Sequence, residues 1–590
     1  MKNFKKQLVR CLAVGLSAAA TLAAAGCGGG IITDEPERTD ISYLYVSTRD
    51  AGLGDSWLIS MASRFEEKYK DVSFEEGKKG VIVETEANRS LSGTGILGTI
   101  ESSTYSVFLV ENMNYVDYMA NDLLYDLSDA VTKELDDGSG TILSKMGDAQ
   151  KEFLTGYNGN YYALPWFSCF NGVTYDAGLF TERELYFAAE NGLKPFTTSV
   201  YTGEAYTGRG FISAGNQTKS CGPDGISGTF DDGLPSSYEE FFYLLEYMTD
   251  VKGVDPFIYT GASEHYLNYM FQSLFLNWAG AKQVEHSLAF DSGEDKVRII
   301  TSFDENDDPV VEEVQLTEDN GYLASQLEAK YYATKFMMKL FENESDYFYS
   351  RSTNSTFTNL DAQTIFINSN LNSKYSPIGM LIEGNYWYQE ANSALTALEN
   401  KYGDRGTNLN LRFMPLPAQE TGTVEVGSGK TAVVGDGLKY YLVVNGNIKS
   451  DPVKKELAEL FVQFCYEDAS LQDATLVTSV PIAVDYALTT EQYNSAYNYT
   501  QSVWDIYTNA IENDAFCNTV SGSKIFMANW PSFGIDTTSA TFESTIAYDA
   551  YSITYGTPRA ALKEGVSAKE YFLGLGISES TWNSNYNIYK

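Results

Sequence analysis

The spacing of hydrophobic residues near the start of the chain predicts a strand, a helix and a second strand. Residues 41–47 (ISYLYVS) and 81–87 (VIVETEA) are short apolar runs typical of strands. Between them, over residues 55–70, hydrophobic side chains recur at every fourth position, which predicts an amphipathic helix. These residues are Trp57, Met61, Phe65 and Tyr69. A strand–helix–strand order predicts an α/β protein with a mostly parallel sheet.

The same α/β pattern continues along the chain. Predicted strands cover 105–111, 364–370, the run that opens 378–391, and 439–448. Residues 411–417 are an extended run closed by prolines, and a small antiparallel β insert covers 288–316. Predicted helices cover 114–129, 236–248, 322–343 and 451–468. Ser236 and Glu239 have the spacing of a capping box, and Asp451-Pro452 is a typical helix start.

The first 26 residues have the pattern of an export signal. Lys2, Lys5, Lys6 and Arg10 precede an apolar stretch over 11–26, and small residues come directly before Cys27. Removal of residues 1–26 would change the net charge from −38 to about −42, because it removes four positive charges and no negative ones. A chain this acidic repels nucleic acid and anionic lipid.

A glycine- and aspartate-rich loop, PDGISGTFDDG, precedes the helix predicted at 236–248. Asp224, Asp231 and Asp232, together with backbone carbonyls, could hold one structural Ca²⁺, although the spacing does not fit an EF-hand. The alternative is a turn that binds no metal. Beyond this ion, no cofactor is expected. Cys169, Cys221, Cys465 and Cys517 lie far apart without a CxxC pair, so one or two disulfides or free buried thiols are both compatible with the sequence.

Several segments, in order, resemble the carbohydrate-binding solute-binding lipoproteins of bacterial ABC importers, the maltose-binding protein family. The resemblance covers about residues 41–490 and rests on these segments: the export signal ending at Cys27, FEEKYK, DYMANDLLYDLSD, GNYYALPWFSCFNGVTYDAGLF, LPSSYEEFFYLLEYM, EGNYW, MPLP, VVNGNIKSDPVKKELAELFVQF and SVPI. It implies an α/β fold of two lobes joined by crossover hinge strands, with an enlarged second lobe that carries the β insert.

By this resemblance, residues 1–26 are a lipoprotein signal peptide, Cys27 is the lipidated residue and 27–40 form a flexible tether. Lobe 1 comprises 41–163 and 437–483, and lobe 2 comprises 164–436 and 484–590. The protein is then a monomeric surface protein, held on the outer face of the bacterial cell membrane by its lipid anchor. It would pass a carbohydrate, expected to be an oligosaccharide, to the permease subunits of an ABC transporter.

A sugar site needs flat aromatic rings and polar groups that converge from both lobes. The residues that lie where the family places its site are Trp166, Glu383, Asn385, Tyr386, Trp387, Asn529 and Trp530, with Asp50, Glu111 and Asn112 at strand ends of lobe 1. For each tryptophan the alternative is a place in the core, and for each acid a solvated surface.

Two other functions compete with sugar binding. An extracellular glycoside hydrolase would need two carboxylates, which 79 acidic residues can supply, but no hydrolase motif surrounds any pair. GxSxG and HExxH are absent, and only His265 and His286 are present, so we expect no enzyme. A peptide- or metal-ion-binding lipoprotein is the third alternative.

Overall fold

The computed structural model describes residues 38–50, 52–93, 95–111, 113, 123–155, 158–215, 217–371, 374–402, 409–420, 432, 434–436, 440–518 and 554–589. The elements below belong to one compact unit, Ser42–Lys590. Among the helices of these residues, none has the length and apolar character required to cross a membrane.

The first sheet has five strands in the order β2-β1-β3-β12-β4. They are β2 (Val81–Asn88), β1 (Ser42–Arg49), β3 (Val107–Glu111), β12 (Tyr440–Val444) and β4 (Ala163–Pro165). β1 pairs in parallel with β2 and β3, which confirms the predicted opening unit, whereas β12 is antiparallel to both of its neighbours. The sheet is therefore mixed, because β12 comes from a distant part of the chain and runs in the opposite direction.

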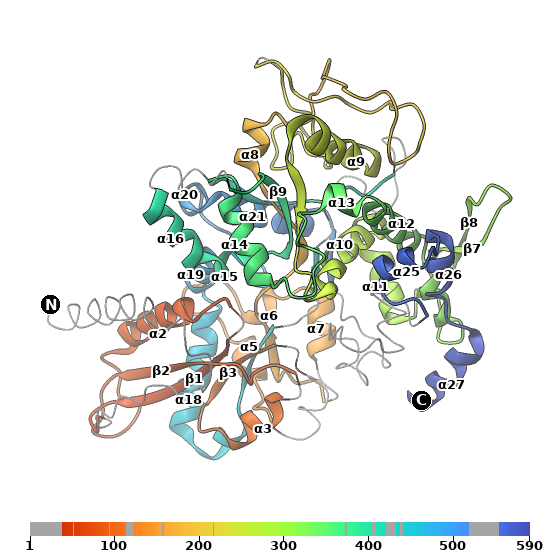
Figure 1. Cartoon of the computed structure of the whole chain (residues 1–590). Helices are drawn as coiled ribbons and strands as arrows, with labels where there is room; N and C mark the ends of the chain where they lie inside the picture. The colour runs from red at the N-terminus through yellow and green to blue at the C-terminus, as the bar shows by residue number, and fades with distance from the viewer. Residues whose placement is uncertain are drawn as a thin grey trace. The chain divides into compact units, whose positions relative to one another are not determined.

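Helices lie around this sheet (Figure 1). They are α2 (Ser56–Tyr69), α3 (Gly95–Ser102), α5 (Ser128–Thr132), α6 (Ile142–Lys145), α7 (Asp148–Leu154), α18 (Pro452–Cys465) and α19 (Asp468–Thr478). In α2 the predicted stripe of Trp57, Met61 and Phe65 is buried. Asp451 caps α18 by accepting hydrogen bonds from the amides of Val453 and Lys454, as its sequence predicted.

The second sheet has four strands in the order β10-β5-β9-β6. They are β10 (Leu411–Met414), β5 (Asn171–Asp176), β9 (Ile378–Gly384) and β6 (Asp255–Ile258). The chain passes directly from β4 in the first sheet to β5 in the second. A backbone bridge between Phe167 and Ile482 lies on the same passage. The lobe boundaries predicted above stay a prediction.

The helices that surround the second sheet are more numerous. They are α8 (Ala177–Glu182), α9 (Tyr238–Glu246), α10 (Leu267–Ala279), α11 (Ala281–Ala289), α12 (Glu328–Glu342), α13 (Glu344–Tyr347), α14 (Asn359–Ser369), α15 (Trp387–Glu390), α16 (Asn392–Tyr402), α20 (Thr490–Ser495) and α21 (Asn498–Glu512). A short parallel pair, β11 (Val434–Asp436) and β13 (Phe516–Asn518), completes the described strands of this region.

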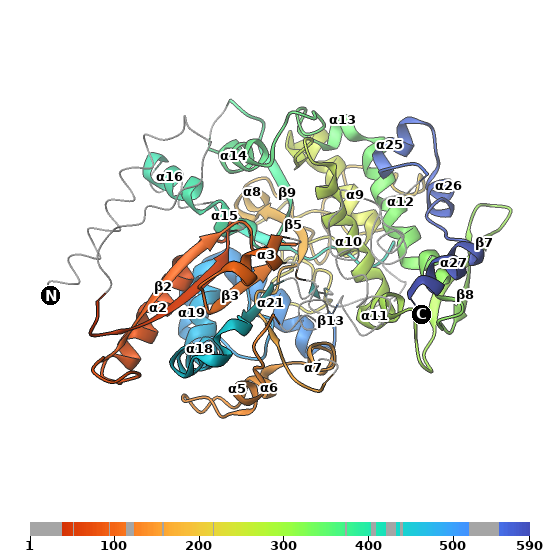
Figure 2. The ribbon, with the colours of Figure 1, turned by 90° about the horizontal axis from the view of Figure 1, so that it is seen from below.

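The predicted β insert is an antiparallel hairpin of β7 (Val297–Phe303) and β8 (Pro309–Val314). The C-terminal helices α25 (Pro558–Lys563), α26 (Ala568–Leu573) and α27 (Glu579–Tyr589) lie beside it (Figure 2). Ile300 of β7 and Phe572 of α26 belong to one small hydrophobic cluster, separate from the main core. The last part of the chain therefore covers the insert.

The structure corrects several predicted elements. Residues 364–370 lie in helix α14 instead of a strand, and residues 288–290 close α11 instead of opening the β insert. The helix predicted at 322–343 is interrupted at Leu327, between a 3₁₀ turn and α12. Of the helix predicted at 114–129, residues 114–122 lie outside the described residues and 123–127 are not helical.

The start of α9 also differs from its prediction by one residue. Ser237, not Ser236, caps the helix, because its side chain accepts a hydrogen bond from the amide of Glu240. The carboxylate of Glu240 in turn accepts from the amide of Ser236 at 2.9 Å. Cys169, Cys221, Cys465 and Cys517 are present as thiols in this structure, and all but the half-buried Cys221 are buried.

Candidate functional site

Strand ends of the first sheet bring an arginine and a glutamate together. β1 and β3 are parallel neighbours, so Arg49 and Glu111 lie at the same edge. Arg49 Nε donates to Glu111 Oε2 at 3.1 Å. β12 begins at this edge because it is antiparallel, and Tyr440 pairs directly with Glu111. Open α/β sheets commonly place ligands at such carboxyl ends.

The second sheet contributes a matching strand end. β9 ends at Glu383 and Gly384, opposite the start of β5 at Gly172 and Asn171. Glu383 is buried, and Gln363 Nε2 of α14 donates to its Oε1 at 3.4 Å. On the other side of β5, Asn171 Nδ2 donates to Gln272 Oε1 of α10 at 2.7 Å. Polar side chains from α10, α14 and two strands therefore meet at one end of the second sheet.

Glu390, at the end of α15, connects the two sheets. It approaches the loop that follows β1: a Cβ added to Gly52 would lie 2.5 Å from Glu390 Oε1. Gly52 also has a φ of +87°, in the region that favours glycine. Both the backbone conformation and the space therefore require glycine here, and the close approach places Glu390 against the first sheet.

Glu111, Glu383 and Glu390 form what we call the carboxylate cluster. Burial raises the pKa of Glu390 to about 7, and the negative charge of Glu111 contributes to this rise. Burial, followed by the charge of Glu390, raises the pKa of Glu383 well above its ordinary value. Buried carboxyl groups that act on one another in this way are typical of ligand and active sites, where the ligand supplies the missing partners.

Four tyrosines line the carboxylate cluster: Tyr266, Tyr269, Tyr386 and Tyr440. Burial, followed mainly by the charges of the nearby glutamates, raises the pKa of Tyr266 and of Tyr440. The hydroxyls of these residues are therefore neutral at ordinary pH and can donate or accept hydrogen bonds. The rings of Tyr266 and Tyr269 lie 4.9 Å apart at the start of α10. The cluster thus combines aromatic faces with carboxyl and hydroxyl groups.

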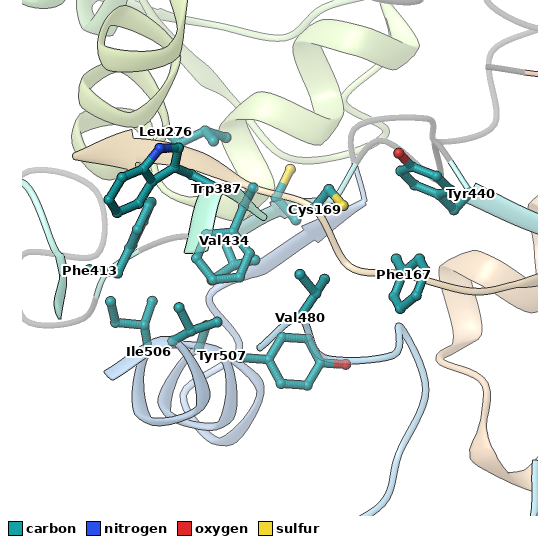
Figure 3. Packing of buried hydrophobic residues seen from close by; sticks show 14 of the residues in the cluster. Phe167, Cys169, Leu276, Trp387, Phe413, Val434, Tyr440, Val480, Ile506 and Tyr507 are labelled. Carbon is teal, nitrogen blue, oxygen red and sulfur yellow. The ribbon is translucent and has the colours of Figure 1, made fainter. Parts of the chain in front are cut away.

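The predicted tryptophans Trp166 and Trp387 are fully buried in this structure. Trp166 packs against Trp57 and Tyr466, each with a centroid separation of 5.6 Å. Trp387 belongs to the main hydrophobic core, part of which Figure 3 draws. The indole N–H of each is buried without an acceptor. In this conformation neither ring presents a face to solvent.

Two other predicted site residues, Asn385 and Asp50, form polar contacts within the protein. Asn385 is fully buried, and its amide joins β9 to the start of β5: Oδ1 accepts from the amide of Phe170 at 3.1 Å, and Nδ2 donates to the carbonyl of Ser168 at 3.0 Å. Asp50 forms an ion pair with Arg89 at 3.0 Å. Cys27, Asn112, Asn529 and Trp530 lie outside the described residues. Among the described residues, Asp224, Asp231 and Asp232 included, no group of three or more His, Cys, Asp or Glu side chains is placed to hold a metal ion. Of the predicted site residues, the structure therefore places Glu111 and Glu383 in the carboxylate cluster and Tyr386 beside it.

Sequence reasoning missed one member of the cluster, Glu390, and several residues around it: Arg49, Tyr266, Tyr269, Gln363 and Tyr440. One of them had a local signal, because Glu390 lies three residues after Trp387 in the predicted helix start and so close to the same helical face. The tyrosines at 266 and 269 had none, since nothing in their own segment indicates that α10 points at the end of β9.

Comparisons with known proteins bear on the fold. No family model and no curated protein sequence matches the chain. Among solved structures, the chain is similar to a chitin oligosaccharide binding protein, with 13% identity over 93% of this chain and 100% of that one, at a TM-score of 0.51.

It is also similar to a maltose-bound T. maritima protein (MalE3), with 12% identity over 92% of this chain and 100% of that one, at a TM-score of 0.47. The GacH receptor of Streptomyces glaucescens matches with 16% identity over 93% and 100%, at 0.48. The prediction drawn from the sequence motifs is confirmed at the level of the fold: the chain has the two-lobed α/β fold of solute-binding proteins.

Proposed function

We propose that this protein is the substrate-binding subunit of a bacterial ABC importer and that it binds a carbohydrate, an oligosaccharide, at the carboxylate cluster between the two sheets. The observation that carries the proposal is the convergence of Glu111 with Glu383 and Glu390 from opposite sheets. A ligand held by both sides would draw the lobes together, which is how such proteins signal to a permease.

The chemistry of the cluster suits a sugar. Hydroxyl groups of a sugar donate hydrogen bonds to carboxylates, and its C–H faces pack on aromatic rings such as those of Tyr269 and Tyr386. Burial makes unpaired carboxyl groups costly, so a ligand that supplies hydrogen-bond donors to Glu383 and Glu390 gains more than one that supplies acceptors.

The charge of the cluster favours neutral sugars over acidic ones. Glu111 is paired with Arg49, whereas Glu383 and Glu390 have no ion-pair partner among the described residues. The raised pKa values mean that these surroundings disfavour a negative charge, so they would disfavour the carboxylate of a uronate or another acidic sugar in the same way. We therefore expect neutral oligosaccharides to bind and oligouronates to be excluded.

Export and anchoring complete the proposal, and they rest on the sequence alone. Residues 1–26 would act as the signal peptide, and the acylated Cys27 would hold the protein on the outer face of the cell membrane. In a bacterial host that processes lipoproteins, Cys27→Ala should move the protein from the membrane fraction to the medium. An unchanged membrane fraction would contradict the anchor.

A glycoside hydrolase is the second candidate, because Glu383 and Glu390 have raised pKa values as general acids do. We favour binding over catalysis, since the fold is that of a solute-binding protein. Release of reducing ends from a bound oligosaccharide would establish the hydrolase instead.

The test is isothermal titration calorimetry with a panel of neutral oligosaccharides, oligouronates and peptides. We expect a neutral oligosaccharide to bind, and Glu383→Gln to weaken that binding at least about tenfold while the circular dichroism spectrum is retained. Glu101→Gln, at an exposed position of α3, is the control and should bind normally. Binding of peptides alone, or equal affinity of Glu383→Gln and the unsubstituted protein, would overturn the proposal.

A further inference from the structure

Tyr266 and Tyr269, two of the four tyrosines that line the carboxylate cluster, come from one short stretch of the chain. Tyr266 ends the 3₁₀ turn Glu264–Tyr266, and Tyr269 lies in the first turn of α10, which follows directly. Burial, followed by the charge of Glu383, raises the pKa of both hydroxyls, as expected for rings beside the cluster. The placement of the two rings therefore depends on what holds this turn.

The chain enters the turn from β6, through the loop 259–263. β6 is parallel to β9, so both strands end at the edge of the second sheet where Glu383 lies. The loop is fixed on a neighbouring segment: Thr260 Oγ1 and the amide of Ala262 both donate to the carbonyl of Phe357 at 3.0 Å. These bonds lie before Glu264, so they fix the loop and not the turn that follows it.

The C-terminal part of the chain binds the first residue of the turn. Both carboxylate oxygens of Glu264 accept hydrogen bonds from it: Oε1 from Arg559 Nη1 at 2.7 Å, and Oε2 from Thr557 Oγ1 at 3.1 Å. Thr557 also caps α25, because its side chain accepts from the amide of Ala560. The turn that ends at Tyr266 is therefore joined to the start of a helix that lies almost three hundred residues further along the chain, since 295 residues separate Glu264 from Arg559.

Arg559 is itself held in a fixed orientation. Its Nε and Nη2 donate to the two carboxylate oxygens of Glu344 in α13, at 2.6 and 2.7 Å. A guanidinium group is planar and its donors point in fixed directions, so these two bonds aim the remaining nitrogen at Glu264. The helix that carries Arg559 lies beside α12 (Figure 2), and Ala561 of α25 is buried in the small cluster that includes Tyr331 of α12.

We propose that Arg559 is a positioning residue for the ligand site: through Glu264 it holds the turn that places the two tyrosines beside the carboxylate cluster. This inference rests on the proposed function, which makes the cluster the sugar site. A site whose parts are already in place binds its ligand more tightly than one that must first be ordered. The resemblance described above covers about residues 41–490, so the positioning contact comes from a segment beyond it.

Two alanine substitutions separate positioning from simple stabilisation. Glu344→Ala removes the partner that accepts two bonds from Arg559, so it should lower the urea midpoint of unfolding at least as much as Glu264→Ala does. Only Glu264→Ala frees the turn. If the turn is then in place in about a tenth of the molecules, the apparent Kd for a sugar rises about tenfold. In Glu344→Ala, Arg559 Nη1 and Thr557 still hold Glu264, and Kd should stay unchanged.

The test uses the mature full-length protein and two measurements, with Glu264→Gln as a milder variant that keeps the shape of the side chain. Hydrogen–deuterium exchange needs no ligand. It is read at the amides of residues 270–274, which donate to the carbonyls of residues 266–270 at the start of α10 and lose protection when the helix start opens. We expect faster exchange there in both Glu264 variants and no change in Glu344→Ala. Titration calorimetry with maltotriose and chitotriose as the probes gives Kd.

Unchanged exchange at residues 270–274 in a folded Glu264→Ala or Glu264→Gln protein would overturn the proposal. A rise in Kd that Glu344→Ala shares in full would also overturn it, because Arg559 would then only stabilise the fold. The two proposals fail in different ways. A protein that binds no neutral sugar loses its proposed function, whereas the exchange measurement still decides whether Arg559 holds the turn.

Discussion

The charge of Glu390 should make the folded protein less stable as the pH rises from about 4.5 to 7. Burial and the charge of Glu111 raise the pKa of Glu390 from 4.5 to about 7. Between these values the folded protein holds a proton that the unfolded chain has released, so stability falls with increasing pH and levels off above about pH 7. Glu390→Gln removes the charge and nearly keeps the shape, and should therefore remove this loss.

The magnitude follows from the two pKa values. A tenfold difference in proton affinity is worth about 1.4 kcal/mol, so ionising Glu390 in the folded protein costs up to about 3 kcal/mol. At pH 8 we expect Glu390→Gln to be more stable than the unsubstituted protein by up to that amount. At pH 5, where Glu390 is protonated in the folded state, the two proteins should differ little.

The assay is urea unfolding of both proteins at pH 5 and pH 8, followed by tryptophan fluorescence. Glu246, with a pKa raised to about 7, and Asp505, with a pKa raised to about 6, impose the same trend on the whole protein, so the measured quantity is the difference between variant and unsubstituted protein at each pH. Exposed Glu101→Gln is the control. An equal difference at both pH values would refute the reasoning.

Two further substitutions test an ion pair and a close approach of two backbone segments. Arg559 is only 9% exposed and donates from Nε and Nη2 to both carboxylate oxygens of Glu344. Arg559→Met should lower the free energy of unfolding in urea by about 2 kcal/mol, a value between those for exposed and fully buried ion pairs. No measurable loss would show that α25 does not depend on this pair. A Cβ on Gly192 would lie 2.3 Å from the carbonyl carbon of Gly210, so Gly192→Ala should lower the free energy of unfolding by about 1–3 kcal/mol and the Tm measured by calorimetry with it. The control is Gly215→Ala, whose Cβ meets nothing within 4 Å and which should keep the Tm unchanged. Equal Tm values for the two variants would contradict the close backbone approach.

The parts of the fold that were predicted correctly carry strong local signals. The stripe of α2, the Asp-Pro start of α18 and the apolar run of β9 each determine their element within one segment. The run at 364–370 was assigned wrongly because its three consecutive apolar residues, Ile365, Phe366 and Ile367, are typical of a short buried strand and show no helical stripe. Its start signal lies upstream, where Thr358 and Asp361 form a capping box. Reading that box first would have predicted α14.

The tryptophan candidates show a different limit. Residue type and position at a strand end placed Trp387 correctly at the start of α15, but the face of the helix on which a ring lies depends on what packs against it. Phe366 and Tyr499, from α14 and α21, surround the ring at centroid distances of 5.8 and 6.3 Å. Neither helix adjoins Trp387 in the sequence, so its burial could not be predicted from its own segment.

The carboxylate cluster is assembled by sheet topology. Glu111 reaches it because β3 is parallel to β1, and Tyr440 because β12 enters the same sheet in the opposite direction. Glu383 comes from the end of β9 in the other sheet, and Glu390 from the end of α15, where it meets the loop after β1 at the glycine at position 52. A sequence pattern can predict each strand end, but which ends face one another depends on pairings between segments hundreds of residues apart.

This assembly has a consequence for how the protein would close. The rise in the pKa of Glu390 has two sources, burial and the charge of Glu111, and Glu111 belongs to the opposite sheet. If the lobes separate, both sources weaken and the pKa of Glu390 returns toward its ordinary value. The arrangement with the sheets in contact therefore binds a proton more tightly than a separated one would, and by linkage acid favours contact between the lobes. A sugar that donates hydrogen bonds to Glu390 would offset the same cost without a proton, so acid and ligand should each favour closure.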